Sequence, residues 1–211
     1  MKTLNLFGKA LILASSLFLA TSAVYAQENQ LDGMPAATYN LDLTHASVVW
    51  KVSHLGFSTY VGRFNNFDAT LELDSKDFTK SSVSVEIKVD SLDTDYPNPE
   101  KEDFNKVLAE EWFKSGDHPN IVFKSTSVSA LNDSQFTIDG DLSLMGQTHP
   151  VTLNAKLNGA APSHPFTKKP VIGFSATTTI DRTAWGLTKF APKIGEQVAI
   201  EIEGEFVNNA N

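Results

Sequence analysis

The chain has 211 residues, no cysteine and a formal net charge of −8 with neutral histidines. Because no disulfide can form, the fold must rest on an apolar core, which excludes the small disulfide-stapled secreted scaffolds. The acidic charge, without a basic patch in the sequence, argues against binding to nucleic acid or to anionic lipid headgroups.

Residues 1–26 have the pattern of a secretory signal peptide. Lys2 and Lys9 give a positive start, an apolar run follows, and small residues precede a cleavage site near Ala26. The run is short and interrupted for a membrane span of about 20 residues, although an uncleaved anchor is the alternative. Cleavage removes two lysines and no acidic residue, so the mature chain carries a net charge of −10.

Residues 27–37 are polar, contain glycine and proline, and show no periodicity, which predicts a flexible leader. One domain is then expected over residues 38–211. Its first strand covers residues 39–43.

The stretch from Ser47 to Phe67 is the richest in aromatic residues. In its first half Val48, Trp50, Val52 and His54 alternate with more polar residues, as in a β-strand. Gly56 interrupts the pattern, and the second half gathers aromatic rings around Arg63. Either a packed hairpin or the wall of an apolar pocket explains this composition.

Further strands are predicted wherever apolar and polar residues alternate. These segments cover residues 67–73, 82–89, 121–131, 136–144, 151–157, 171–180 and 197–206. One segment, residues 99–112, has the apolar spacing of an amphipathic helix, with Asn98 as a cap and Pro99 at the first helical position. A helix that closes the end of a barrel explains it best, and a mobile lid is the alternative.

Strands with one apolar and one polar face, joined by short connections, favour an antiparallel meander. The expected fold is therefore all-β with one short amphipathic helix, an antiparallel barrel of roughly eight strands. A two-sheet sandwich is the alternative, because periodicity does not distinguish the two.

The sequence contains little that indicates catalysis. The five histidines show no metal-ligand spacing, and there is neither cysteine nor a Gly-x-Ser-x-Gly elbow. No metal site, no cofactor and no enzymatic activity are expected. His54 is the exception to weigh, either as a hydrogen-bonded core histidine or as a polar contact to a ligand. Arg63 and Arg182 suit an ion pair or the polar group of a ligand at a pocket mouth.

Several short motifs follow one another along the predicted domain. They are YNLD at 39–42, WKVSH at 50–54, GRF at 62–64, SLDT at 91–94, PNIVFKST at 119–126, GDL at 140–142, MG at 145–146, THPV at 148–151, DR at 181–182 and WG at 185–186. Their order and spacing resemble the YceI family of periplasmic, polyisoprenoid-binding proteins with a lipocalin-like barrel. The segment 99–112 departs from that family, because it lacks an arginine and a histidine that usually follow the Asp93-Thr94 turn.

The resemblance implies a tunnel for a long isoprenoid lipid, a periplasmic location, often a homodimer, and no reaction. We therefore expect an exported, non-catalytic carrier or scavenger of an isoprenoid chain of the quinone or polyprenyl phosphate type, with at most transient membrane contact. The alternatives are an interaction module with a filled barrel and, from the enzyme class, a protein that uses His54. Arg63 and Arg182 are the candidate polar residues near the mouth. The candidate lining residues are Trp50, Val52, His54, Phe57, Phe64, Phe67, Phe123, Phe136, Leu142, Leu144, Phe174 and Trp185.

Overall fold

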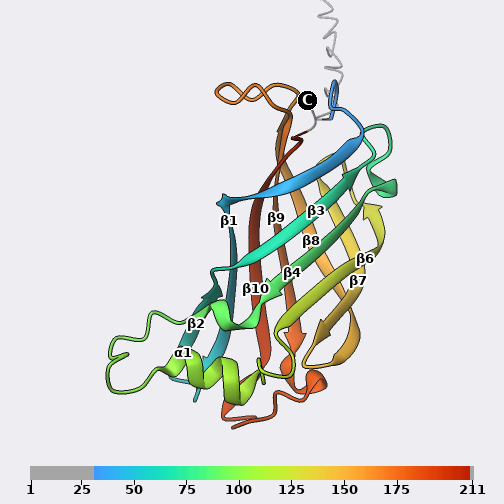
Figure 1. Ribbon diagram of the computed structural model, residues 1–211. Coiled ribbons are helices and arrows are strands. Elements are labelled where there is room, and N and C mark those ends of the chain that lie inside the picture. The colour runs from blue at the N-terminus through green and yellow to red at the C-terminus, as the bar shows by residue number, and fades with distance from the viewer. Residues whose placement is uncertain (1–30, 210–211) are drawn as a thin grey trace, which may run out of the picture.

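The computed structural model describes residues 31–209, and the expected signal peptide lies outside the described residues. Ten strands make up one antiparallel sheet (Figure 1). They are β1 (Ala37–His54), β2 (Ser58–Phe64), β3 (Phe67–Leu73), β4 (Ser82–Lys88), β5 (Leu92–Asp93), β6 (Asn120–Ala130), β7 (Gln135–Leu144), β8 (Gln147–Ala161), β9 (Val171–Asp181) and β10 (Ile194–Val207).

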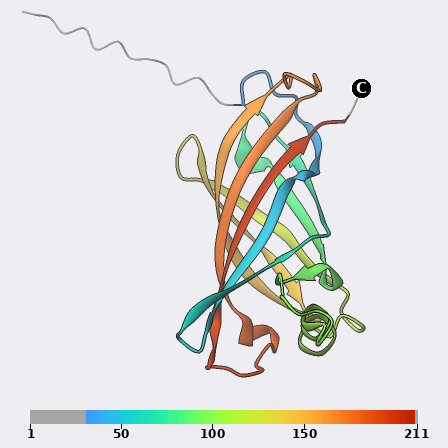
Figure 2. The ribbon, with the colours of Figure 1, turned by 90° about the vertical axis from the view of Figure 1, so that its left-hand side faces the viewer.

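The sheet closes on itself because β1 also pairs with β10 (Figure 2). The ring runs through eight strands, β1, β3, β4, β6, β7, β8, β9 and β10, while β2 and the short β5 extend it beside the second half of β1. This confirms the expected antiparallel barrel of about eight strands and excludes the two-sheet sandwich.

The alternation seen in the sequence determines which side chains face inward. In β4, for example, Val83, Val85 and Ile87 point toward the barrel interior, while Ser84 and Glu86 are exposed. Because β-strand side chains alternate between faces, each strand supplies one apolar wall and one polar outer surface.

Strand β1 is longer than the sequence predicts. The two expected strands at 39–43 and 47–55 form one 18-residue strand with an irregularity between Asp42 and Ala46. The first part of β1 pairs with β3 and the second part with β2, so the irregularity marks where the strand changes its neighbour.

The expected helix is shorter than residues 99–112. It begins with α1 (Phe104–Val107), capped by the Asp103 carboxylate, which accepts a hydrogen bond from the Lys106 amide, and it continues as the π-helical turn η3 (Leu108–Trp112). The expected start, with Asn98 as the cap and Pro99 as the first helical residue, is wrong. Asp103 provides the side-chain cap instead. No helix within residues 31–209 is long and apolar enough to cross a membrane.

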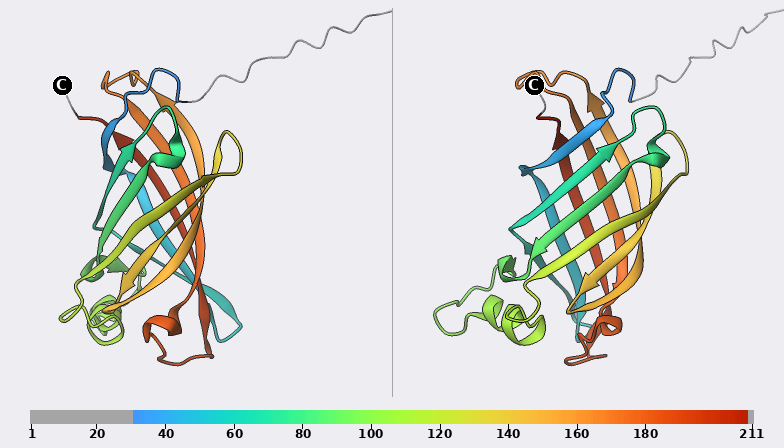
Figure 3. Two further views of the ribbon diagram at one scale, coloured as in Figure 1. Left: turned by 90° about the vertical axis from the view of Figure 1, so that its right-hand side faces the viewer. Right: turned by 45° about the vertical axis from the view of Figure 1, so that its right-hand side comes forward.

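Three short 3₁₀ turns, η1 (Phe78–Lys80), η2 (Val89–Ser91) and η4 (Arg182–Trp185), lie in connections between strands. Figure 3 shows α1 at the end of the barrel opposite the chain termini, beside the connection that leads from β9 to β10. This placement confirms that the helix lies at a barrel end.

The end of the barrel that carries the termini is plugged by buried side chains. Leu31, Met34 and Tyr39 are all less than 10% exposed there. Residues 27–30 of the expected leader lie outside the described residues, and in the remaining part Leu31 and Met34 pack into the core.

Candidate functional site

A cavity of about 480 Å³ runs along the inside of the barrel. This volume lies within the range of about 300–1,000 Å³ that is common for small-molecule sites. All eight strands of the ring, together with β2, the helix and the β9–β10 connection, contribute to its wall. Nearly all of these side chains are aliphatic or aromatic, so the wall can offer dispersion contacts and an apolar environment to a ligand.

The cavity is closed at one end and open at the other. Near the termini its wall is formed by Leu71, Phe78 and Phe206, each less than 10% exposed. Near the helix the wall includes His54, which is exposed, and Phe190, which is 60% exposed. The mouth therefore lies between the β1–β2 turn, the helix and the β9–β10 connection.

Phe78 closes the inner end of the cavity. Its ring lies 4.4 Å from that of Phe136 and 5.6 Å from that of Phe174, measured between centroids. It enters from η1, held by the Asp77 carboxylate that caps this turn. A connection without strand periodicity thus supplies a side chain that limits how deep a ligand can reach.

A run of aromatic rings leads from the strands to the helix at the mouth. Tyr60 lies 6.2 Å from Trp50, His54 and Phe104, between ring centroids. The Trp50 indole packs against Gly62, where an added Cβ would lie 2.2 Å from the ring, so position 62 cannot carry a side chain without displacing Trp50. The Trp50 Nε1 is buried without a hydrogen-bond partner in the structure.

Arg182 is the one arginine or lysine in the cavity wall, and it is 6% exposed. Its guanidinium donates to the backbone carbonyls of Gly195, Leu187, Lys189 and Ile194. Burial lowers the pKa of Arg182, although an arginine stays charged at neutral pH. Since most of its donors are already used, its role is to hold the β9–β10 connection in place.

Most of the expected lining residues do face the cavity. Phe136 and Trp185 are buried beside it, and Trp185 donates from Nε1 to the Leu142 carbonyl at 3.1 Å. The expected residues that line the cavity are Trp50, Val52, His54, Phe64, Phe67, Phe123, Leu142, Leu144, Phe174 and Arg182.

Four of the expected residues do not line the cavity: Phe136 and Trp185 are buried beside it, and Phe57 and Arg63 are exposed. Phe57 is 89% exposed, because a turn that places Leu55 and Gly56 at positive φ carries it beyond the end of the barrel. Arg63 is also exposed, since strand alternation puts it on the outer face of β2, where it pairs with Asp95. The prediction that Phe57 lines the pocket is wrong, and Arg63, expected as a polar contact near the mouth, is engaged with Asp95 instead.

Sequence reasoning missed seven aromatic residues of the wall: Tyr60, Phe78, Phe104, Trp112, Phe113, Phe190 and Phe206. Phe104 and Trp112 belong to the apolar stripe of the expected helix, which was a usable signal. Phe78 and Phe190 lie in connections between strands, where no periodicity indicates the direction of a side chain.

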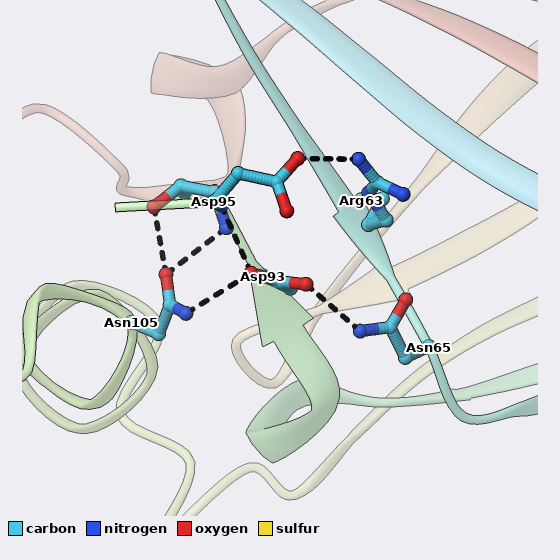
Figure 4. Close-up of polar contacts among 6 residues, drawn as sticks. Arg63, Asn65, Asp93, Asp95 and Asn105 are labelled. Carbon is cyan, nitrogen blue, oxygen red and sulfur yellow. Dashed lines mark hydrogen bonds and ion pairs between the residues drawn. The ribbon is translucent and has the colours of Figure 1, made fainter. Parts of the chain in front are cut away.

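A polar network fastens the helix to the barrel (Figure 4). The Asn105 side-chain oxygen accepts from the amide and the hydroxyl of Thr94, and its nitrogen donates to Asp93 at 3.2 Å. Asp93 also accepts from Asn65 and from the Asp95 amide, and this amide lowers the pKa of Asp93 most, ahead of Asn65. We call Asn65, Asp93, Thr94 and Asn105 the helix latch.

Within residues 31–209, no group of three or more histidine, cysteine, aspartate or glutamate side chains is arranged to hold a metal ion. The candidate site is thus the apolar cavity itself, a chamber with one open end. Its geometry suits an elongated apolar ligand.

A closed antiparallel barrel around an apolar chamber, with a helix at its open end, defines the lipocalin-like class of β-barrel proteins. The chain belongs to the YceI-like domain family, whose model matches residues 39–206. It is 32% identical over 171 residues to a UPF0312 protein of Vibrio cholerae, covering 80% of this chain and 87% of the relative. It is 36% identical over 152 residues to a UPF0312 protein of Pseudomonas paraeruginosa, covering 71% of each chain.

Solved structures share the fold at low sequence identity. Burkholderia cenocepacia BcnA superposes with a TM-score of 0.67 at 19% identity, covering 78% of this chain and 98% of that one. A Campylobacter jejuni YceI protein gives 0.64 at 22% identity, covering 76% and 91%. A polyisoprenoid binding domain from Saccharophagus degradans gives 0.54 at 12% identity, covering 80% and 97%.

Proposed function

We propose that this protein is an exported, non-catalytic carrier or scavenger that holds the tail of a long isoprenoid lipid inside its barrel. The observation that carries the proposal is the apolar cavity of about 480 Å³, which opens toward the helix. The polyisoprenoid binding domain of Saccharophagus degradans, which has the same fold, supports the choice of ligand class.

Burial of the lipid tail supplies enough free energy for binding. Each methylene group removed from water contributes about 0.8 kcal/mol, so about ten of them give a gross gain of roughly 8 kcal/mol. Ordering of the tail and loss of its translational freedom consume part of this gain. A charged contact to the headgroup is therefore not needed for affinity.

The cavity favours a tail that ends in a neutral headgroup, such as a quinone. Arg182 is the one arginine or lysine in the wall, and its guanidinium is bound to four backbone carbonyls. A phosphate inside the chamber would lose its hydration without gaining a free cation, which is costly. The unpaired Trp50 Nε1 could donate to a neutral acceptor after a small ring movement.

Two further parts of the proposal rest on the sequence. The pattern of residues 1–26 supports export to the periplasm. The absence of a nucleophile motif supports a role without catalysis, and the family resemblance supports a homodimer, which light scattering of the mature protein would measure.

The proposal is tested by native mass spectrometry of the mature protein purified gently from the periplasm, followed by organic extraction and identification of the lipid. A stoichiometric isoprenoid adduct is the expected result. An empty protein that also fails to take up added quinones and polyprenyl phosphates would overturn the proposal and favour an interaction module instead.

A further inference from the structure

We propose that the open end of the barrel docks on the surface of an electrically neutral lipid bilayer through three apolar side chains, Leu55, Phe57 and Phe190, here called the apolar rim. This inference rests on the proposed function, because a carrier of a membrane lipid has to meet a membrane. The surface that meets the membrane is the apolar rim, and the contact is made by apolar side chains.

The rim residues are among the exposed large apolar side chains of the described residues. Leu55 is 47% exposed, Phe57 is 89% exposed and Phe190 is 60% exposed. The two loops that carry them lie side by side, because the Leu55 amide donates to the Lys193 carbonyl, and the Ile194 amide donates to the Phe190 carbonyl. Figures 2 and 3 show the β1–β2 turn and the β9–β10 connection projecting at the same end of the barrel.

Leu55 occupies a backbone conformation that is unfavourable for leucine. It has a φ of 55° at a central position of the turn, where the Phe57 amide donates to the His54 carbonyl. Hairpin turns with positive φ at both central residues prefer Asn or Asp followed by Gly. A leucine that is both strained and exposed gains nothing in the free protein, whereas burial in a bilayer offsets both costs.

The rim is continuous with the cavity. Phe190 lines the cavity itself, and His54, next to Leu55, also lines it. A bilayer that covers the rim would therefore lie directly against the mouth. A lipid tail could then pass between membrane and barrel without crossing water.

The charges beside the rim are balanced. Lys189 pairs with Glu111 at 3.1 Å. Lys193, whose carbonyl accepts from the Leu55 amide, is followed three residues later by Glu196 at the start of β10, so these two contribute opposite charges. No excess of positive charge favours anionic lipids, and the strongly acidic chain as a whole is repelled by them. We therefore expect docking by apolar insertion, which is insensitive to salt.

The opposite end of the barrel provides a matched control. Phe166 is 87% exposed, nearly as much as Phe57, but it lies in the β8–β9 connection near the termini, where the cavity is closed. Single exposed apolar residues of this kind are common on protein surfaces and need no partner.

The test measures flotation of the mature protein with phosphatidylcholine vesicles at low and high salt, for the wild type, the double variant L55N/F57S and the control F166S. The same samples are analysed by native mass spectrometry for retained lipid. We expect vesicle binding to fall at least about tenfold in L55N/F57S, because each lost side chain removes a substantial apolar burial. F166S should bind vesicles as the wild type does. High salt should not change vesicle binding, and the amount of retained lipid should be the same in all three proteins.

The single variant L55N gives a second readout. Asparagine tolerates positive φ better than leucine, so the midpoint of thermal unfolding should rise by about 2 °C while vesicle binding falls. Stability and docking would then move in opposite directions, which general damage to the fold cannot produce.

Three outcomes would overturn the docking proposal. They are equal vesicle binding by the wild type and L55N/F57S, an equal loss in F166S, or self-association of the wild type that the double variant abolishes, which would assign the rim to a second copy of the chain. Failure of the proposed function is distinct, because a wild type without any lipid would still show whether the rim binds vesicles.

Discussion

Leu144 shows how a single position depends on the barrel being hollow. It is 4% exposed and lines the cavity, while its neighbour Ser143 faces outward and shares a hydrogen bond with Thr148. A polar group placed at position 144 would enter the space that the lipid tail is proposed to occupy. The same group at position 143 would enter water.

We therefore predict that Leu144→Arg abolishes lipid retention while the domain stays folded. An arginine stays charged, and a buried charge costs several kcal/mol even after water enters a hollow site, which a domain with a stability of roughly 5–15 kcal/mol can tolerate. Circular dichroism with urea titration reports the fold, and mass spectrometry reports the lipid. Ser143→Arg is the control and should change neither. Unfolding of the Leu144→Arg variant would mean that side chains fill the barrel at this point.

The helix is the element whose position decides the shape of the mouth. Phe104, Leu108 and Trp112 contribute to the cavity wall, and the helix latch ties this segment to β5 and to Asn65, the residue that follows β2. Across the mouth, the Trp112 ring lies 5.7 Å from that of Phe190. The side chains that border the opening are therefore held by only a few polar contacts.

We predict that Asn105→Ala raises amide hydrogen exchange in residues 104–112 about tenfold, because the loss of its hydrogen bonds costs roughly 1–2 kcal/mol of local stability. Exchange in the strands should stay unchanged. Asn158→Ala, which removes an exposed hydrogen bond to Ser175, is the matched control. Equal exchange of the helix in both variants would show that packing alone holds it.

The latch also has a pH dependence with a defined sign. The Asp95 amide, and then Asn65, hold the pKa of Asp93 below its ordinary value, so Asp93 stabilises the folded latch when ionised. This contribution is complete above the ordinary pKa of about 4 and is lost as the pH falls below it toward the lowered folded pKa. The difference in helix exchange between wild type and Asn105→Ala should therefore shrink below about pH 4.

At the scale of the whole molecule, closure of the barrel and the distribution of charge together decide what can enter. The chain is acidic, and most charged side chains of the described strands are exposed. The one arginine inside is bound to the backbone. The interior therefore offers an apolar environment with no free cation.

We predict that a quinone with a long prenyl tail binds at least about tenfold more tightly than a polyprenyl phosphate of equal tail length, since burial of the unpaired phosphate is costly. Quenching of tryptophan fluorescence measures both affinities, because Trp50 and Trp112 line the cavity. Equal or tighter binding of the phosphate would contradict the prediction and place the headgroup outside the mouth, where Lys189→Gln should then weaken it.

Local patterns in the sequence were enough to indicate the strands, the barrel and most of its lining. Alternation is a property of each strand by itself, so Trp50, Phe123 and Leu144 could be assigned to an inner face without knowledge of the strand pairing. The helix could be recognised from its apolar stripe, although its start depended on which residue capped it. The family could be recognised because its motifs are spread along the whole domain.

The tertiary structure alone decided which end of the barrel is open and which side chains reach the interior from connections. Phe78 and Phe190 enter from segments without periodicity, and Phe57 leaves the interior because of one turn. The sequence did not distinguish the roles of the two arginines. In the structure Arg63 pairs with Asp95 on the outside of the barrel, while Arg182 donates to backbone carbonyls inside it. The physical reason is the same in each case, because these positions depend on contacts between residues far apart in the chain.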